Sequence, residues 1–321
     1  MPSFAHPKEQ LDVIGRGIDR IVERKELLAK LSDSCDSGRP LRVAAGFDPS
    51  SPDLHLGHTV VLRMLRRFQE LGHDVIVLLG DFTARYGDPT DQLEPRPRID
   101  AATIRSNAES YKQQMARLLD MKRTRFVFNS SWLEDLSLER LLQAAAHIGL
   151  PRMTGRPDLG SRSDLRLDEL IYPLLQAYDS VHLELDLEIG GTDQLANLLL
   201  GRELMIAMCK APQCIITTEL LEGTDAYLDE GQFVGNKMSQ RLANTITLGD
   251  SKEEIQTKVE GLDEALVWRY FDLLTDCSFP QIRAFQADRE SGKRSVEEIR
   301  AFLTEEIIAG LGLDCGEHQK P

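Results

Sequence analysis

Residues 41–82 read LRVAAGFDPSSPDLHLGHTVVLRMLRRFQELGHDVIVLLGDF. The runs LRVAAGF and HDVIVLLGDF are almost continuously apolar, which is typical of strands in a parallel sheet covered on both faces. Between them, apolar residues recur at helical spacing over residues 56–71, and Gly72 follows as a stop signal. A strand, a helix and a second strand make one βαβ unit with a right-handed crossover. This unit predicts an α/β fold built on a parallel sheet.

The same alternation continues along the chain. Further strands are expected in TRFVFN, LELDLEIGG and QCIITTELL, with helices between them. We expect Ser137 to cap the N-terminus of one of these helices. Residues 8–33 carry apolar side chains at helical spacing and predict a helix, whereas beyond about Lys252 only helical patterns remain. The sequence therefore predicts a doubly wound, Rossmann-like domain with a helical insertion, followed by an all-α C-terminal domain.

The composition restricts the class of protein. The 321 residues are 41% hydrophobic and carry a net charge of −14, which opposes indiscriminate nucleic-acid binding. No apolar run approaches the ~18 residues of a membrane span, and the first residues do not resemble a secretory signal. The five cysteines form no C-x-x-C pair. We therefore expect a reduced, cytoplasmic protein without a membrane partner.

Three segments are expected at the carboxyl edge of the sheet, where ligands bind in such folds. They are GFDPSSPDLHLGH, GDFTARYGDP and GGTDQ, all rich in residues that let backbone approach a ligand and hydrogen-bond it. The chain contains neither G-x-x-x-x-G-K-[ST] nor G-x-G-x-x-G. A nucleotide, if bound, is held in another way.

The segment HLGH suggests such a way. His55 and His58 lie at a helix N-terminus, where free N–H groups favour an anion, and Gly57 leaves room for a base or ribose. Zinc binding is a second interpretation, although no nearby cysteine or third histidine completes a site. A purely structural pair is the third. Far along the chain, Lys237 lies on the glycine-containing loop VGNKMSQR, which we expect to be mobile because few packing contacts are predicted for it.

GFDPSSPDLHLGH followed by KMSQR resembles the two signatures of class I aminoacyl-tRNA synthetases. The segments GDFTARYGDPT, YPLLQAYDSV and GGTDQLANLLLGREL are similar to bacterial tyrosyl-tRNA synthetases, and LVWRYFDLLTD resembles the start of their helical domain. The resemblance covers roughly residues 10–310. It implies ATP-dependent activation of tyrosine or a tyrosine-like amino acid as an adenylate, with transfer to the acceptor end of tRNA, and a homodimer.

The resemblance also implies residue roles in ATP binding. His55, Gly57 and His58 would hold ATP and stabilise the pentavalent phosphate, and Lys237 would neutralise the departing pyrophosphate. Such a reaction needs positioning and charge stabilisation rather than a protein nucleophile. Mg²⁺ would accompany the nucleotide, and no protein-bound metal is expected. The residues implied to bind ATP are Gly46, Asp48, His55, Gly57, His58, Gly191, Asp193, Lys237, Met238 and Ser239.

A second group is implied to bind the amino acid. Asp88, Tyr172 and Gln176 would hold its ammonium group, since a charged donor requires several acceptors. Asp179 would face the phenol hydroxyl. Taken singly, these side chains also fit a turn or the polar rim of a helix. The implied group is Ala44, Thr83, Asp88, Tyr172, Gln176, Asp179 and Gln194, and Asp193 with Gln194 would also line the ribose.

Several residues depart from the family pattern. Gln240 replaces the second lysine of the usual KMSKS signature, and Arg241 follows it. Ala44 stands where many tyrosyl enzymes have a tyrosine, so we expect space beside the substrate ring, and Leu195 stands where many have tryptophan. The chain ends at residue 321, before the RNA-binding module of bacterial relatives, so we expect weak charging of ordinary tRNA.

Two alternatives stay open. The first is a paralog that activates an amino acid for a non-tRNA acceptor or a small-molecule pathway. The second is a non-catalytic binding or regulatory protein on the same fold, against which the presence of His55, His58 and Lys237 argues. The expected domains are an N-terminal helical segment at 1–38, a Rossmann-like catalytic domain at 39–225 with a helical insertion at about 91–170, and the signature loop with the helical domain at 226–321.

Overall fold

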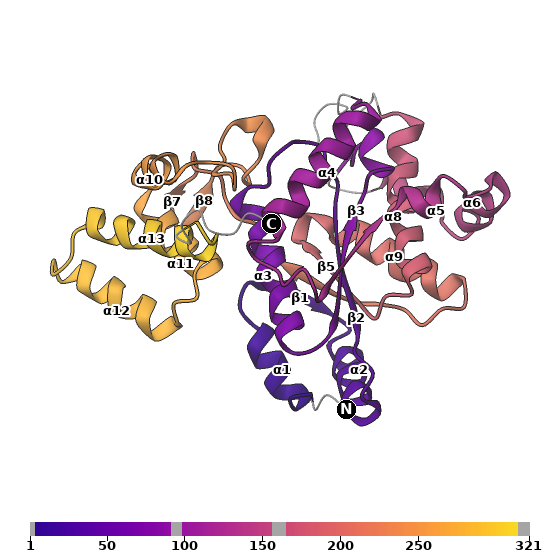
Figure 1. Cartoon of the computed structure of the whole chain (residues 1–321), viewed down its shortest axis with the longest axis horizontal. Coiled ribbons are helices and arrows are strands. Elements are labelled where there is room, and N and C mark those ends of the chain that lie inside the picture. Colours follow the sequence, from indigo (N-terminus) through magenta and orange to yellow (C-terminus); the bar gives the residue numbers. More distant parts are fainter. Residues whose placement is uncertain (1–3, 91–97, 156–164, 314–321) are drawn as a thin grey trace. The chain divides into compact units, whose positions relative to one another are not determined.

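The computed structural model describes residues 4–90, 98–155 and 165–313 (Figure 1). Part of the Pro- and Asp-rich loop at 87–100, part of the insertion predicted at 91–170, and Cys315 lie outside these residues. The chain forms two compact units. Unit 1 comprises residues 1–52, 64–112 and 119–219, and unit 2 comprises residues 53–63, 113–118 and 220–321. The predicted domain boundaries at 38/39 and 225/226 stay a prediction.

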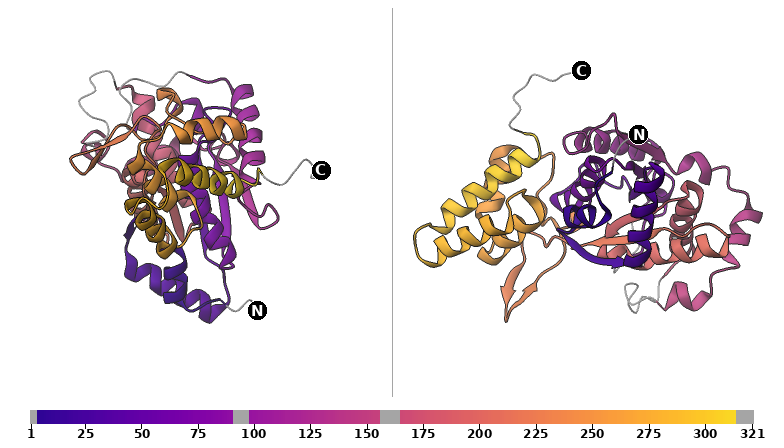
Figure 2. Two further views of the ribbon diagram at one scale, coloured as in Figure 1. Left: turned by 90° about the vertical axis from the view of Figure 1, so that its left-hand side faces the viewer. Right: turned by 90° about the horizontal axis from the view of Figure 1, so that it is seen from below.

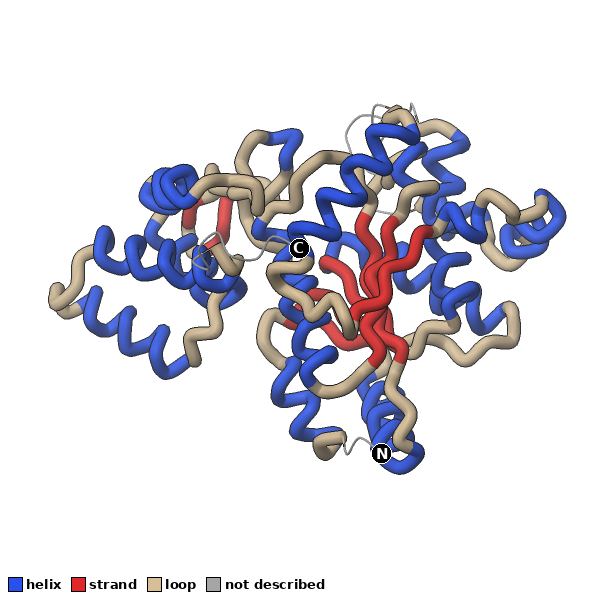
Figure 3. Tube along the Cα trace, viewed as in Figure 1, coloured by secondary structure: helices blue, strands red, loops and turns tan. Residues whose placement is uncertain are grey.

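Unit 1 is built on a six-stranded sheet of order β1-β6-β5-β2-β3-β4, drawn in red in Figure 3. The strands are β1 Ile18–Val22, β2 Arg42–Phe47, β3 Asp74–Leu79, β4 Thr124–Phe128, β5 Leu187–Gly191 and β6 Cys214–Thr218. The neighbouring strands among β2, β3, β4, β5 and β6 are parallel to one another. The edge strand β1 pairs with β6 in the antiparallel direction. The chain runs from β2 through β3 to β4 on one side and from β5 to β6 on the other. The strand order therefore reverses between β2 and β5, where doubly wound folds bind ligands.

Helices surround this sheet, as the sequence predicted. They are α1 Pro7–Ile14, α2 Arg24–Ser37, α3 Leu56–Glu70, α4 Ala101–Met115, α5 Ser130–Leu133, α6 Leu138–Ala145, α7 Leu150–Thr154, α8 Leu167–Leu183 and α9 Leu195–Ala207. α3 and α4 contribute residues to both units. The strands β2 and β3 are buried over nearly their whole length, which explains why their sequences are almost continuously apolar. The predicted Rossmann-like fold is confirmed.

The predicted N-terminal helix over residues 8–33 is wrong. α1 ends at Ile14, the chain turns at Gly17 with φ 76°, and β1 follows before α2 begins. Ile18 and Ile21, which had suggested helical spacing, pair with β6 at the edge of the sheet. Pairing with a distant strand outweighs the local pattern for such β-branched residues. Similarly, β4 lies inside the range 91–170 and pairs with β3, so that range carries sheet as well as helix.

Unit 2 contains the helices α10 Lys252–Glu260, α11 Glu264–Leu274, α12 Phe279–Glu290 and α13 Val296–Gly310, which confirm the predicted helical C-terminal region. A hairpin that the sequence analysis missed precedes them, with strands β7 Tyr227–Asp229 and β8 Gln232–Val234 (orange in Figure 2). Glu230 and Gly231 join its strands with φ of 46° and 82°, as a two-residue hairpin turn requires. In the described part of the chain, no helix has both the length and the apolar content needed to cross a membrane.

Candidate active site

The HLGH segment at residues 55–58 lies in unit 2 at the beginning of α3. The backbone of Leu56 donates to Ile246 O (2.9 Å), and Leu248 donates to Leu54 O (2.8 Å), so the chain entering the helix is held like a short strand. A Cβ at Gly57 would lie 3.0 Å from the His55 ring. The glycine therefore gives the first histidine its room.

The two histidines form a close pair. Their ring centroids are 3.9 Å apart, and the His55 backbone N–H donates to His58 Nδ1 at 3.1 Å. Burial, together with the charges of His58 and Lys237, lowers the pKa of His55 to about 2. Burial lowers the pKa of His58 to about 4, against the opposing effect of its hydrogen bond with the His55 backbone. His55 Nδ1 is buried and has no hydrogen-bond partner among the residues that the structure describes. Both imidazoles are thus neutral at pH 7 and suited to hydrogen-bond a ligand.

The KMSQR segment, residues 237–241, lies in the same unit. Met238 is buried and donates its backbone N–H to Leu221 O (2.8 Å). It also lies close to Gly57, because a Cβ added to that glycine would be 3.8 Å from the Cβ of Met238. Lys237 pairs with Glu222 through the backbone. The structure therefore brings the two predicted signatures together. Apart from the buried Met238, the side chains of residues 231–241 are exposed or half-buried, and the mobility of this loop stays a prediction.

Asn244 organises the signature loop from within. It is 2% exposed, accepts the backbone N–H of Ser239 (2.8 Å), and donates to Asp225 Oδ1 (2.8 Å) and Lys237 O (3.4 Å). Ala243, with φ 53°, turns the chain so that Asn244 reaches back. Asn244 was not predicted, because an asparagine after a motif carries no signal of its own.

In unit 1, Asp48 follows β2 at the carboxyl edge of the sheet. It accepts hydrogen bonds from Thr83 Oγ1 (2.8 Å) and Tyr172 Oη (2.9 Å). A Cβ at Gly80 would lie 1.9 Å from Asp48 Oδ1, so only glycine allows this approach. Residues predicted to bind ATP and the amino acid thus lie next to each other.

Asp179 on α8 is 2% exposed. Trp132 Nε1 donates to one carboxyl oxygen (2.8 Å) and Asn129 Nδ2 to the other (3.1 Å); Asn129 Nδ2 also donates to Thr83 (3.0 Å). Burial raises the pKa of Asp179 well above its ordinary value, the two hydrogen bonds oppose the shift, and nearby carboxylates add to it. Neither donor was predicted from the sequence, although Asn129 ends TRFVFN at the expected edge.

A third carboxylate lies in a hydrogen-bonded chain. Gln194 Nε2 donates to Asp88 Oδ2 (2.8 Å), and Gln176 Nε2 donates to Gln194 Oε1 (3.4 Å). Thr90 donates to Asp88 Oδ1 through its backbone N–H (2.9 Å) and its hydroxyl (2.7 Å). Within the described part of the chain, the buried Gln176 Oε1 has no hydrogen-bond partner. The structure therefore joins three of the residues predicted to bind the amino acid.

The remaining predicted residues lie on the same sheet. Gly46 is in β2, Gly191 ends β5, and Asp193 lies in the turn Thr192–Gln194 that follows. Ala44 is buried in an apolar cluster with Ile76 and Leu185, and the expected space beside the substrate ring stays a prediction. Among the described residues, no group of three or more His, Cys, Asp or Glu side chains could hold a metal ion.

The family model of "tRNA synthetases class I (W and Y)" matches residues 36–313. The chain belongs to this family of class I aminoacyl-tRNA synthetases. A tyrosine--tRNA ligase of Desulfotalea psychrophila is 42% identical over 313 residues, which are 96% of this chain and 75% of that relative. One from Aromatoleum aromaticum is 43% identical over 303 residues, 93% and 73% of the two chains.

Solved structures agree on the fold of the class I synthetase. The crystal structure of tyrosyl-tRNA synthetase complexed with L-tyrosine from Archaeoglobus fulgidus matches with a TM-score of 0.76 and 24% identity, over 95% of this chain and 98% of that one. The corresponding structure from Pyrococcus horikoshii also has a TM-score of 0.76, at 18% identity, over 96% and 95% of the two chains. At such identities the likeness shows the fold alone.

Proposed function

We propose that this class I synthetase activates tyrosine with ATP and transfers it to tRNA. The observation that carries the proposal is that HLGH and KMSQR, which lie about 180 residues apart in the sequence, lie together in unit 2. In activation, a carboxylate oxygen of tyrosine attacks the α-phosphorus of ATP, the bond to the β-phosphate oxygen breaks, and pyrophosphate leaves. Negative charge builds up on the phosphate oxygens, so catalysis needs donors and one cation rather than a nucleophile.

The unit 2 residues fit this chemistry. His55 and His58 are neutral and can donate hydrogen bonds to phosphate without binding a metal. Lys237 supplies positive charge close enough to His55 to lower that pKa, and we assign it to the departing pyrophosphate. We assign Met238, Ser239 and Gly57 to the walls of the phosphate site. Mg²⁺ would be bound through the nucleotide's own phosphates, where it supplies further charge.

The unit 1 residues fit recognition of the amino acid. We assign Asp88, Gln176 and Tyr172 to the ammonium group, which requires acceptors on several sides. Asp179 is assigned to the phenol hydroxyl, because Asn129 and Trp132 fix both oxygens of its buried carboxyl group. A ring without the hydroxyl would leave this polar group buried and poorly paired, at a cost in binding free energy.

Transfer to tRNA is proposed over a small-molecule acceptor because relatives more than 40% identical over most of the chain are named tyrosine--tRNA ligases. We place the enzyme in the cytoplasm, where tRNA charging takes place. The buried phosphate-handling pair and the second signature beside it also argue against a non-catalytic protein.

A homodimer is part of the proposal. The helices α6 and α7 both contact α8. On these three helices, four large apolar side chains are 59–72% exposed. They are Leu138, Leu142, Leu150 and Leu167. Contact with a second copy would remove this surface from water. Sedimentation equilibrium that gives the mass of two chains supports the dimer, and the mass of one chain at micromolar concentration contradicts it.

The function is tested by amino-acid-dependent ATP–pyrophosphate exchange across the standard amino acids, followed by charging of bulk tRNA. We expect exchange with tyrosine, and Lys237→Ala should reduce it by about 100-fold through lost charge stabilisation. Lys293→Ala, which removes an exposed lysine of the same unit, is the matched control. Exchange without charging would favour the alternative acceptor. No exchange with any amino acid would favour the non-catalytic protein.

A further inference from the structure

We propose that Gln240 is a positioning residue that ties the second signature to the chain carrying the first. The inference rests on the proposed function, because it assigns Gln240 to the same adenylation step. It concerns the position at which this chain departs from the family's KMSKS pattern. In place of a second cation, the chain has a neutral tether.

The tether is a hydrogen bond from Gln240 Nε2 to the backbone carbonyl of Asp53, two residues before His55. The Asp53 end is held firmly. Gln114 donates to Asp53 Oδ1 (3.0 Å) and accepts the backbone N–H of Leu54 (2.8 Å). The carbonyl that receives the tether is therefore fixed on both sides, next to the histidine pair.

The other end of the tether, Gln240, belongs to the loop that carries Lys237. Gln240 begins the single turn Gln240–Leu242, after which Asn244 reaches back to Ser239 N and Lys237 O. The hydrogen bonds of Asn244 therefore hold Lys237, Ser239 and Gln240 together in one loop. Fixing Gln240 on Asp53 fixes the backbone of Lys237 relative to His55.

A neutral amide suits this task better than a second lysine. The charge of Lys237 already lowers the pKa of His55, and a second ammonium group on the same loop would add to that field. The amide donates to the carbonyl without a charge, so charge and position are supplied by different residues. Lys237 carries the charge, and Gln240 holds it in place.

The experiment compares Gln240→Ala, Gln240→Asn and Gln240→Lys in tyrosine-dependent pyrophosphate exchange. Removal of the donor, or its shortening by one methylene in Gln240→Asn, should lower kcat about tenfold, equivalent to about 1.4 kcal/mol. KM for tyrosine should stay within about twofold, because the tether acts on the phosphate side. Gln240→Lys keeps a donor but adds a charge to the loop, so its kcat should fall by no more than about threefold. Gln256→Ala, the same change at an exposed glutamine of α10, is the control.

Limited trypsin digestion supplies a readout that does not depend on activity. Cleavage after Lys237 or Arg241 should be faster in Gln240→Ala than in wild type or Gln256→Ala, with unchanged thermal unfolding. The proposal is overturned if Gln240→Ala and Gln240→Asn both match wild type in kcat and in cleavage rate. If Lys237→Ala loses exchange in the same experiment, the proposed function still stands. If Lys237→Ala also retains full exchange, the proposed function itself has failed.

Discussion

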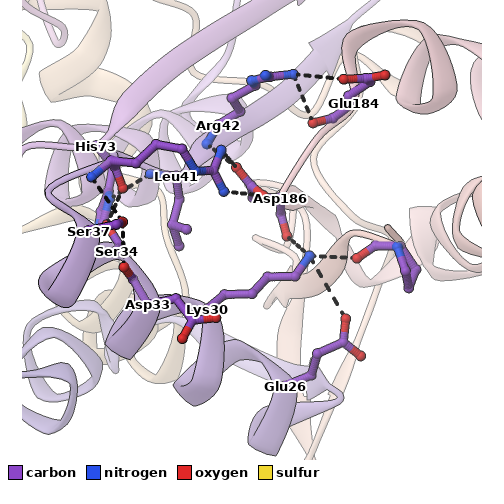
Figure 4. A network of polar contacts seen from close by, with 12 residues as sticks. Glu26, Lys30, Asp33, Ser34, Ser37, Leu41, Arg42, His73, Glu184 and Asp186 are labelled. Carbon is purple, nitrogen blue, oxygen red and sulfur yellow. Dashed lines mark hydrogen bonds and ion pairs between the residues drawn. The ribbon is translucent and has the colours of Figure 1, made fainter. Parts of the chain in front are cut away.

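The two edges of the sheet in unit 1 use charged residues in opposite ways. At the amino edge, cations meet carboxylates and carbonyl groups (Figure 4). Asp186 accepts two hydrogen bonds from Arg39 (both 3.2 Å) and one from the backbone N–H of Arg42 (2.9 Å). Lys30 donates to the carbonyl of Asp186 (3.0 Å) and to that of Pro212. These contacts join α2, β2 and the start of β5.

At the carboxyl edge, the carboxylates are held by neutral donors. Hydroxyl groups donate to Asp48, an amide and a hydroxyl donate to Asp88, and an amide and an indole donate to Asp179. Such bonds fix the direction of a carboxyl group without neutralising it. The amino edge therefore uses its charges to hold the fold together, whereas the carboxyl edge orients the acceptors that we propose to bind the amino acid. Changes at the two edges should separate activity from stability.

The largest expected effect is that of Asp179→Asn on activity. The amide keeps the shape but loses the carboxyl group proposed to pair with the phenol, so kcat/KM for tyrosine in pyrophosphate exchange should fall about 100-fold. Thermal unfolding should change by only a few degrees, because removal of a buried group with a raised pKa offsets the loss of the acceptor for one of the two donors, Trp132 or Asn129. An Asp179→Asn variant that unfolds more easily but keeps full exchange activity would contradict the assignment of the carboxyl edge to substrate binding.

The next effect is a loss of stability at the other edge. Asp186→Ala leaves the backbone N–H of Arg42 and the guanidinium of Arg39 without their acceptor, so the free energy of unfolding should fall by about 3 kcal/mol. Exchange activity at a temperature where the variant is folded should stay within about twofold. Urea titration and exchange assays measure the two quantities. A variant as stable as wild type but poor in exchange would contradict the assignment.

A buried carboxyl group away from both edges sharpens the comparison through pH. Burial raises the pKa of Glu188 to about 7, against an ordinary value near 4.5, while Ser180 and Gln213 hydrogen-bond it. Between these values the folded state binds more protons than the unfolded state, so stability falls as pH rises. From pH 5 to 7.5 this loss should be about 2 kcal/mol, and Glu188→Gln should lack it. Equal pH dependence in both proteins would refute the prediction.

The smallest effect is expected for Arg39→Ala. The Arg39 side chain is 58% exposed, and exposed ion pairs contribute little, so the free energy of unfolding should fall by less than about 1 kcal/mol. The loss should shrink further in high salt, because salt screens exposed charges. A loss as large as that of Asp186→Ala would mean that the arginine, rather than the backbone of Arg42, carries the amino-edge contact.

Local sequence patterns predicted the central βαβ unit because its strands are buried over nearly their whole length and its helix has one apolar face. They also predicted the helix cap at Ser137, which accepts the backbone N–H of Arg140 at 3.2 Å. The patterns failed at β1, whose conformation is decided by pairing with β6 about 200 residues later.

The candidate site was predictable to a similar degree. The family motifs supplied both signatures, and the structure places them together. The residues that orient the site were not predictable in this way. Asn129 and Asn244 act through hydrogen bonds formed only in the folded chain, and single polar residues outside a motif give no periodic signal. For the same reason Gln240 looked like a lost cation until its bond to Asp53 was seen.

The central claim is that the enzyme selects tyrosine through Asp179, and one comparison tests it most directly. Pyrophosphate exchange is measured with tyrosine and with phenylalanine, for wild type and for Asp179→Asn. We expect wild type to prefer tyrosine by at least about 100-fold in kcat/KM, and the variant to lose most of that preference, because an unpaired buried polar group penalises the wrong ring. Equal activity of wild type with both amino acids would contradict the account.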